Sequence, residues 1–101
     1  MSKVDLLASS KTATTAATAI AVVNTMAKSC VIQAKKATGD NANLVYVGTS
    51  VVGTNTTQQV VLEPRGEYTV PIPTGDWMDL NDVKIACVTS GDGVIFHYTP
   101  V

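Results

Sequence analysis

Residues 83–98, VKIACVTSGDGVIFHY, decide the fold. Apolar side chains alternate with other residues in both halves of this stretch, at Val83, Ile85 and Cys87 and again at Val94, Phe96 and Tyr98. A two-residue alternation is typical of a β-strand that buries one face. Glycine and aspartate at residues 90–93 indicate a tight turn between the halves. The stretch therefore predicts a β-hairpin.

Further strands are expected on the N-terminal side of this hairpin, separated by polar turns. Their predicted ranges are about 29–36, 44–48, 58–63 and 67–72, followed by the hairpin strands at 83–89 and 93–99. Residues 11–23 are ambiguous, because their alanines favour a helix whereas their threonines and Ile20–Val23 favour a strand. We expect a strand there. The predicted fold is all-β, an antiparallel β-sandwich or jelly-roll-like domain of about seven to eight short strands.

Three segments between or at the ends of strands carry specific expectations. Glu63–Gly66 has proline second and glycine fourth, which predicts a type I turn. Pro71 and Pro73 cannot donate to a sheet, so the strand before them ends there or lies at an edge. Residues 76–82 are expected to form a loop or a single helical turn that places Trp77 and Leu80 inward.

Length and charge bound the organisation of the chain. With 101 residues, 46% of them hydrophobic and 15% charged, we expect an N-terminal arm over residues 1–11 and a single β-sandwich domain over residues 12–101. Residues 1–36 contain five lysines but only one acidic residue, Asp5, and most acidic residues follow. This asymmetry is either ordinary surface scatter or a basic arm that docks on an acidic surface.

Composition also sets expectations about location and partners. No apolar run approaches the roughly 18 residues of a membrane span, and the start of the chain does not read as a signal peptide. Arg65 is the only arginine, and the sequence pI is about 5.6, so nucleic acid is not expected as a partner. Cys30 and Cys87 alternate with apolar neighbours, which favours two buried free thiols over a disulfide.

No set of residues suggests catalysis. His97 is the only histidine and is expected on the strand face opposite Phe96 and Tyr98. The acidic segment 76–82 lacks EF-hand spacing, so its carboxylates are expected to be solvated or to cap a turn. We therefore expect no enzyme activity, no cofactor, no metal site and no small-molecule ligand. Trp77 and the three tyrosines could form a sugar-stacking platform, although core and rim positions are the simpler expectation.

Five short motifs resemble those of a family of small virion domains in tailed bacteriophages. They are Cys30–Ala34, Asn43–Gly48, Val61–Glu67, Asp79–Val83 and Gly91–Tyr98, and the similarity spans about residues 28–99. In that family a Leu-x-Pro-Gly-Glu-type turn occupies the third motif. Arg65 here stands between the proline and the glycine, which departs from the pattern. The chain is similar to β-sandwich capsid decoration, cement or head-fibre proteins.

The resemblance implies a function and a set of partners. It implies a virion structural protein that decorates the outer surface of a phage head by non-covalent contact with the major capsid protein, after synthesis in the host cytoplasm. It implies a homo-oligomer, a dimer or trimer, with no membrane partner. We expect the arm to provide the contacts, with Leu6 and Leu7 as apolar anchors and Lys3 and Lys11 facing acidic capsid groups; the other interpretation of this segment is a disordered tail. The alternative is a carbohydrate- or receptor-binding module of a phage fibre.

Overall fold

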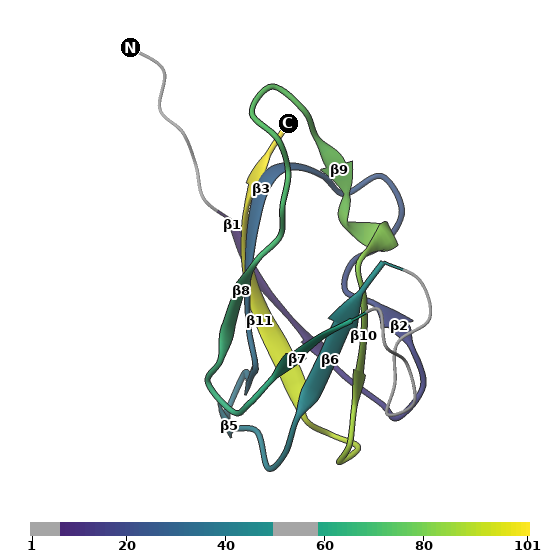
Figure 1. Cartoon of the computed structure of the whole chain (residues 1–101), viewed down its shortest axis with the longest axis vertical. Coiled ribbons are helices and arrows are strands. Elements are labelled where there is room, and N and C mark those ends of the chain that lie inside the picture. Colours follow the sequence, from purple (N-terminus) through teal and green to yellow (C-terminus); the bar gives the residue numbers. More distant parts are fainter. Residues whose placement is uncertain (1–6, 50–58) are drawn as a thin grey trace.

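The computed structural model describes residues 7–49 and 59–101, which form three antiparallel β-sheets (Figure 1). The only helical element in these two ranges is a 3-10 turn, η1 (Leu80–Asp82). The prediction of an all-β fold is confirmed. Eleven strand segments occur where about seven to eight were expected, because several of the segments are only two residues long.

The largest sheet has five strands. Its main path runs in the order β1 (Leu7–Thr12), β11 (Gly93–Pro100), β3 (Met26–Gln33) and β8 (Glu67–Thr69). The two-residue strand β9 (Met78–Asp79) pairs with the beginning of β3. Strand β8 therefore lies at an edge, as Pro71 and Pro73 predicted.

The second sheet has four strands, in the order β2 (Thr18–Ala19), β10 (Lys84–Cys87), β6 (Val45–Gly48) and β7 (Val60–Leu62). Strands β4 (Lys35–Lys36) and β5 (Gly39–Asp40) form a separate hairpin. The expected turn at residues 90–93 does connect β10 to β11, so the two halves of the predicted hairpin are consecutive strands. They belong to different sheets, however, and are not paired with each other.

Both larger sheets contribute to one cluster of buried side chains. Fully buried members include Ile32 of β3 and Val94 of β11 from the first sheet, and Val45 of β6 and Ile85 of β10 from the second. Leu80 of η1 also belongs to this cluster. Burying such side chains contributes about 1.5–3 kcal/mol each, which makes this cluster the main source of stability.

The expectation for residues 11–23 was wrong in its extent. Residues 11–12 end β1 and residues 18–19 form β2, but no continuous strand or helix joins them. Thr14 instead turns the chain locally, since its hydroxyl donates to the Ala16 carbonyl at 3.1 Å. Short threonine hydroxyl bonds of this kind compete with sheet pairing.

The N-terminal arm also differs from the expectation. Residues 1–6 lie outside the described residues, but residues 7–11 belong to β1, which pairs with β11 from Leu7 opposite Tyr98 to Thr12 opposite Gly93. The serines and the lysine of this segment did not suggest a strand. The partner strand β11 supplies the backbone groups that hold it there.

The turn at residues 63–66 has type II rather than type I character. Gly66 N–H donates to the Glu63 carbonyl at 2.8 Å, as in both types, but Arg65 at the third position has φ of 68°. A positive φ at this position defines type II and usually calls for glycine. Arg65 is held there by contacts of its own: its N–H donates to the Ala34 carbonyl at 2.8 Å, and its guanidinium pairs with Asp40.

The expectation that Trp77 and Leu80 both point inward was half right. Leu80 is fully buried, whereas Trp77 is 59% exposed. Trp77 lies at the end of the loop between β8 and β9. That loop arches over the end of the molecule at which the C-terminus lies (Figure 1).

Candidate functional site

Strand β1 is the outermost strand of the five-stranded sheet, and it pairs with β11 on one side only. Five of its six residues are exposed, and the sixth, Lys11, is half-buried. An edge strand of this kind presents a row of backbone N–H and C=O groups that another strand can pair with. Natural edges are commonly protected by proline or by several charges, but β1 contains no proline and only Lys11 as a charge.

Two of the four residues predicted to contact a partner lie on this strand. Leu7 and Lys11 are four positions apart and therefore share one face of β1, about 13 Å apart along the strand. Leu7 is 43% exposed and lies opposite Tyr98, while Lys11 lies opposite Val94. Lys3 and Leu6, the other two, lie outside the described residues.

Apolar surface continues from this edge. A hollow of about 290 Å³ is lined by side chains of β1, β11 and the 20–25 segment: Ser9, Ile20, Ala21, Val22, Thr25, Phe96 and Tyr98. The Phe96 and Tyr98 rings stack with centroids 5.8 Å apart. Val22 is 77% exposed and its neighbour Val23 is exposed as well. Adjacent exposed apolar residues beside a free strand edge are typical of an interaction surface.

The Val22–Thr25 turn is fixed by the carboxylate of Asp79. Its oxygens accept from the N–H of Asn24 at 2.8 Å, of Thr25 at 3.2 Å and of Asn81 at 3.0 Å. These bonds, that of Asn81 foremost, lower the pKa of Asp79. Asp79 is also the N-cap of η1, so the acidic segment does cap a turn, as expected.

The opposite end of β1 is fixed by a buried polar cluster. Asp92, 1% exposed, accepts from the N–H of Ala42 and of Asn43, both at 2.9 Å, and its carbonyl accepts from Ala13 N–H at 2.7 Å. The Lys36 ammonium lies 3.9 Å from the Asp92 carboxylate. The carboxylate is thus satisfied inside the protein and has a structural role.

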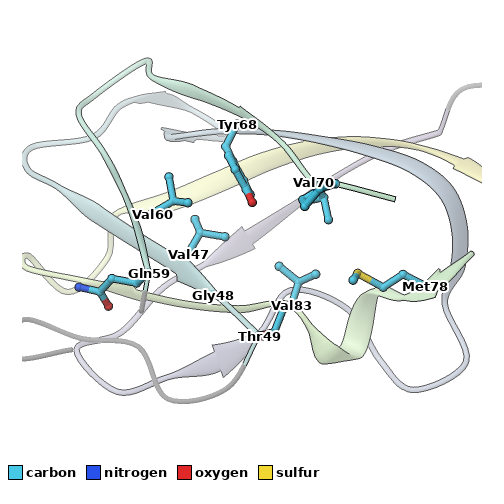
Figure 2. A pocket seen from close by; sticks show the side chains of 10 residues that line it. Val47, Gly48, Thr49, Gln59, Val60, Tyr68, Val70, Met78 and Val83 are labelled. Atoms are coloured by element: carbon cyan, nitrogen blue, oxygen red, sulfur yellow. The ribbon is translucent and has the colours of Figure 1, made fainter. Parts of the chain in front are cut away.

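A second hollow, of about 330 Å³, lies between strands of the two larger sheets (Figure 2). Val47 and Val60 on one side face Tyr68 and Val70 on the other, with Val83 and Met78 at one end (Figure 2). None of its ten lining residues is charged. The hollow is large enough for a small apolar group, but no set of convergent polar groups specifies a ligand there.

A third feature is the loop between β8 and β9. Trp77 lies between two hollows, one of about 400 Å³ beside Pro71 and Pro73 and one of about 500 Å³ beside Lys28 and Thr74. Of the aromatic residues considered as a sugar platform, Tyr46 is buried in the core and Tyr98 stacks on Phe96. The four-residue platform that was the alternative to core and rim positions therefore does not form, although Trp77 itself is exposed.

The groups with reactive chemistry are separate from one another. Cys30 and Cys87 are both buried free thiols, as predicted, and burial raises the pKa of Cys30 to about 11. His97 is exposed on the face opposite Phe96, as predicted. Within residues 7–49 and 59–101, no three His, Cys, Asp or Glu side chains come together in a way that could hold a metal ion.

Sequence reasoning missed the free edge of β1 and the exposure of Trp77. The edge had no signal in the sequence, because β1 lacks apolar alternation. The exposure of Trp77 had a weak signal in Pro71, Pro73 and Gly75, which predict a loop before it.

No helix among the described residues is long and apolar enough to span a membrane. Comparison of the chain with protein-family models, with curated proteins and with solved structures found no match.

Proposed function

We propose that this chain is a virion structural protein, a decoration or cement protein that binds the outer surface of a tailed-phage head. In this proposal the two larger sheets form a β-sandwich of jelly-roll type, and the protein has no enzymatic role. The motif resemblance supports the class of protein. The observation that carries the mode of attachment is the free outer edge of β1.

Attachment through this edge would use strand addition. An extended segment of the major capsid protein pairs with β1, so that backbone hydrogen bonds supply affinity and neighbouring side chains supply specificity. Leu7 and Val22 provide exposed apolar contacts next to the edge, and Lys11 provides a positive charge for an acidic group of the capsid protein. Lys3 and Leu6 precede the strand and extend the same contact along the chain.

The size of the required interface favours several contacts at once. A specific stable complex buries about 1,200–2,000 Å² in total, which is more than a single six-residue strand edge provides. The hollow lined by Ser9, Val22 and Tyr98 adds to the surface. A dimer or trimer at a symmetry axis of the head would multiply the number of such contacts and hence the avidity.

The test is co-sedimentation of the purified protein with undecorated phage heads. Ala13, which follows β1, donates its N–H to the Asp92 carbonyl. In an antiparallel pair the N–H groups of alternate residues point toward the partner strand, so those of Ser9 and Lys11 point toward β11. The N–H of Ser10 therefore points away from β11, toward the free edge. Proline is tolerated at such an outward position of an edge strand, yet it removes a donor that an added strand needs. Ser10→Pro should therefore keep the fold and weaken binding at least tenfold.

Side-chain variants complete the test. Leu7→Ser and Lys11→Glu should each weaken binding to phage heads severalfold. Lys11→Glu should also make the affinity less dependent on salt concentration. Val61→Ser is the matched control, because Val61 is an exposed valine on β7, away from β1. Unchanged binding by folded Ser10→Pro and Leu7→Ser would refute attachment at this edge. Absence of wild-type binding to any undecorated head would refute the decoration role.

A further inference from the structure

The loop between β8 and β9 is held in one shape by short-range hydrogen bonds. Ile72 N–H donates to the Val70 carbonyl at 2.9 Å across Pro71, and Asp76 N–H donates to the Pro73 carbonyl at 2.9 Å. Gly75, third in the second turn, has φ of 88°, which the absence of a side chain allows. Two prolines and two closed turns make this a pre-organised loop, which loses little entropy on binding a ligand.

Both ends of the loop are attached to β3. Val70 N–H donates to the Cys30 carbonyl at 2.9 Å at one end, and Met78 of β9 pairs with Ala27 at the other. Between these two attachment points β3 contains Lys28 and Ser29, both exposed. The loop therefore arches past a short section of β3 that pairs with β11 on its other side but has no strand partner on this side, and a hollow of about 500 Å³ lies there.

The hollow combines an aromatic side chain with polar groups of several kinds. Trp77 and Ile72 give it apolar walls, and the polar lining side chains are Lys28, Ser29, Thr74 and Asp76. Ser29 donates to Thr99 at 3.0 Å. Among the described parts of the chain, the side chains of Lys28, Thr74 and Asp76 form no hydrogen bond or ion pair with one another or with any other residue. Their donors and acceptors are thus available to a ligand.

We propose that this hollow, with Trp77 as its stacking surface, is a carbohydrate-binding site. A sugar ring has an apolar face that can lie on the indole and hydroxyl groups that both donate and accept hydrogen bonds. The Asp76 carboxylate accepts from such hydroxyls, the Lys28 ammonium donates to them, and the Thr74 hydroxyl does either. The volume lies within the range of about 300–1,000 Å³ that small-molecule sites occupy.

The neighbouring hollow points to a ligand of more than one sugar unit. It measures about 400 Å³ and shares Ile72, Asp76 and Trp77 with the first. An oligosaccharide can occupy both hollows and contact Trp77 from each. This proposal goes beyond attachment to the head and does not depend on it, because the hollow is built from the 71–77 loop and β3, not from β1.

The experiment uses the full chain, screened on a glycan array and then titrated with short oligosaccharides of hexose and N-acetylhexosamine units up to about 10 mM. Since Trp77 is the only tryptophan, its fluorescence reports binding directly. We expect saturable binding that shifts the Trp77 emission. Titration calorimetry should show a loss of at least tenfold in affinity for Trp77→Ala, a smaller loss for Trp77→Phe and a severalfold loss for Asp76→Asn.

The control variant is Val88→Ala, which trims an exposed apolar side chain outside the lining of both hollows and should bind as the wild type does. Thermal unfolding checks that each variant is folded. Absence of binding to any oligosaccharide, or full binding by Trp77→Ala, overturns the proposal. If no sugar binds and Trp77→Ala instead weakens co-sedimentation with phage heads, the loop is a protein contact and the carbohydrate proposal is wrong.

Discussion

The side chain of Asn41 and the backbone of Gly93 are joined by two reciprocal hydrogen bonds. Asn41 Nδ2 donates to the Gly93 carbonyl at 2.8 Å, and Gly93 N–H donates to Asn41 Oδ1 at 3.0 Å. Both residues are buried. The amide of Asn41 thus pairs with the beginning of β11 as a neighbouring strand would, at the point where β11 receives β1 on its other side.

Replacing Asn41 with alanine should therefore destabilise the protein. The change leaves a buried N–H and a buried C=O of Gly93 without partners, at a cost of about 1–3 kcal/mol for each group that stays unpaired. Urea unfolding measures the effect. Asn43→Ala is the matched control, because Asn43 is exposed and its Oδ1 accepts only from the adjacent Leu44 N–H. Equal stability of the two variants would contradict this role of Asn41.

A methyl group at Gly93 should disturb the pairing of β1. A Cβ built there would lie 2.5 Å from the backbone oxygen of Lys11, which no side-chain rotation can relieve. Gly93→Ala should lower the free energy of unfolding by roughly 1–3 kcal/mol and accelerate hydrogen exchange along β1. Gly39→Ala, where nothing lies within 4 Å of the added carbon, should leave both quantities nearly unchanged. Exchange in β1 that is as slow in Gly93→Ala as in the wild type would refute this close approach.

The two thiols should react slowly with thiol reagents in the folded protein, and they should lower the free energy of unfolding above about pH 9. Burial raises the pKa of Cys30 from 9.0 to about 11, and burial together with Asp92 raises the pKa of Cys87. The unfolded chain then loses these protons first, so the free energy of unfolding falls as the pH rises from about 9 to 11 and is unaffected by them below pH 9. Cys30→Val should show a weaker fall over this window in urea unfolding.

A thiol reagent gives an independent check. Ellman's reagent should modify Cys30 and Cys87 only at the rate at which the protein opens. Rapid modification of the native protein at pH 8 would show that the thiols are accessible and would contradict their burial.

The Asp79 carboxylate should control the Val22–Thr25 turn. Because its pKa is lowered in the folded state, its contribution to stability is present above pH 4 and is lost as the pH falls below 3.8. Asp79→Asn should speed hydrogen exchange at the amides of Asn24 and Thr25 and remove part of the acid dependence of stability. Asp82→Asn, a change at an exposed aspartate of the same segment, should do neither. Unchanged exchange at Asn24 in Asp79→Asn would contradict the hydrogen bonds from Asn24 and Thr25 to this carboxylate.

The sequence predicted the strands that carry an alternating pattern of apolar residues. Residues 83–98 carry a clear alternation, and the structure has strands at β10 and β11 with a turn between them. Cys30 and Cys87 follow the same alternation, which explains why their burial was predicted. Such patterns act locally, so they are readable without knowledge of the rest of the chain.

Features that depend on distant partners were not predictable. Strand β1 exists because β11 pairs with it, and its own residues carry no strand pattern. Arg65 adopts its positive φ where Asp40, 25 residues away, binds its guanidinium with contacts of 2.9 and 2.8 Å. The pairing of β9 with β3 fixes the far end of the loop from which Trp77 projects. Each is a tertiary contact that overrides local preference.

The most direct test of head attachment through β1 is hydrogen exchange of this protein with and without bound phage heads. The account predicts slower exchange on binding at the outward amides of Ala8, Ser10 and Thr12, which an added strand would pair with. Amides of β7 and β8, two strands at other sheet edges, should exchange at unchanged rates. Protection confined to β7 or β8, with β1 unaffected in the bound protein, would contradict the account.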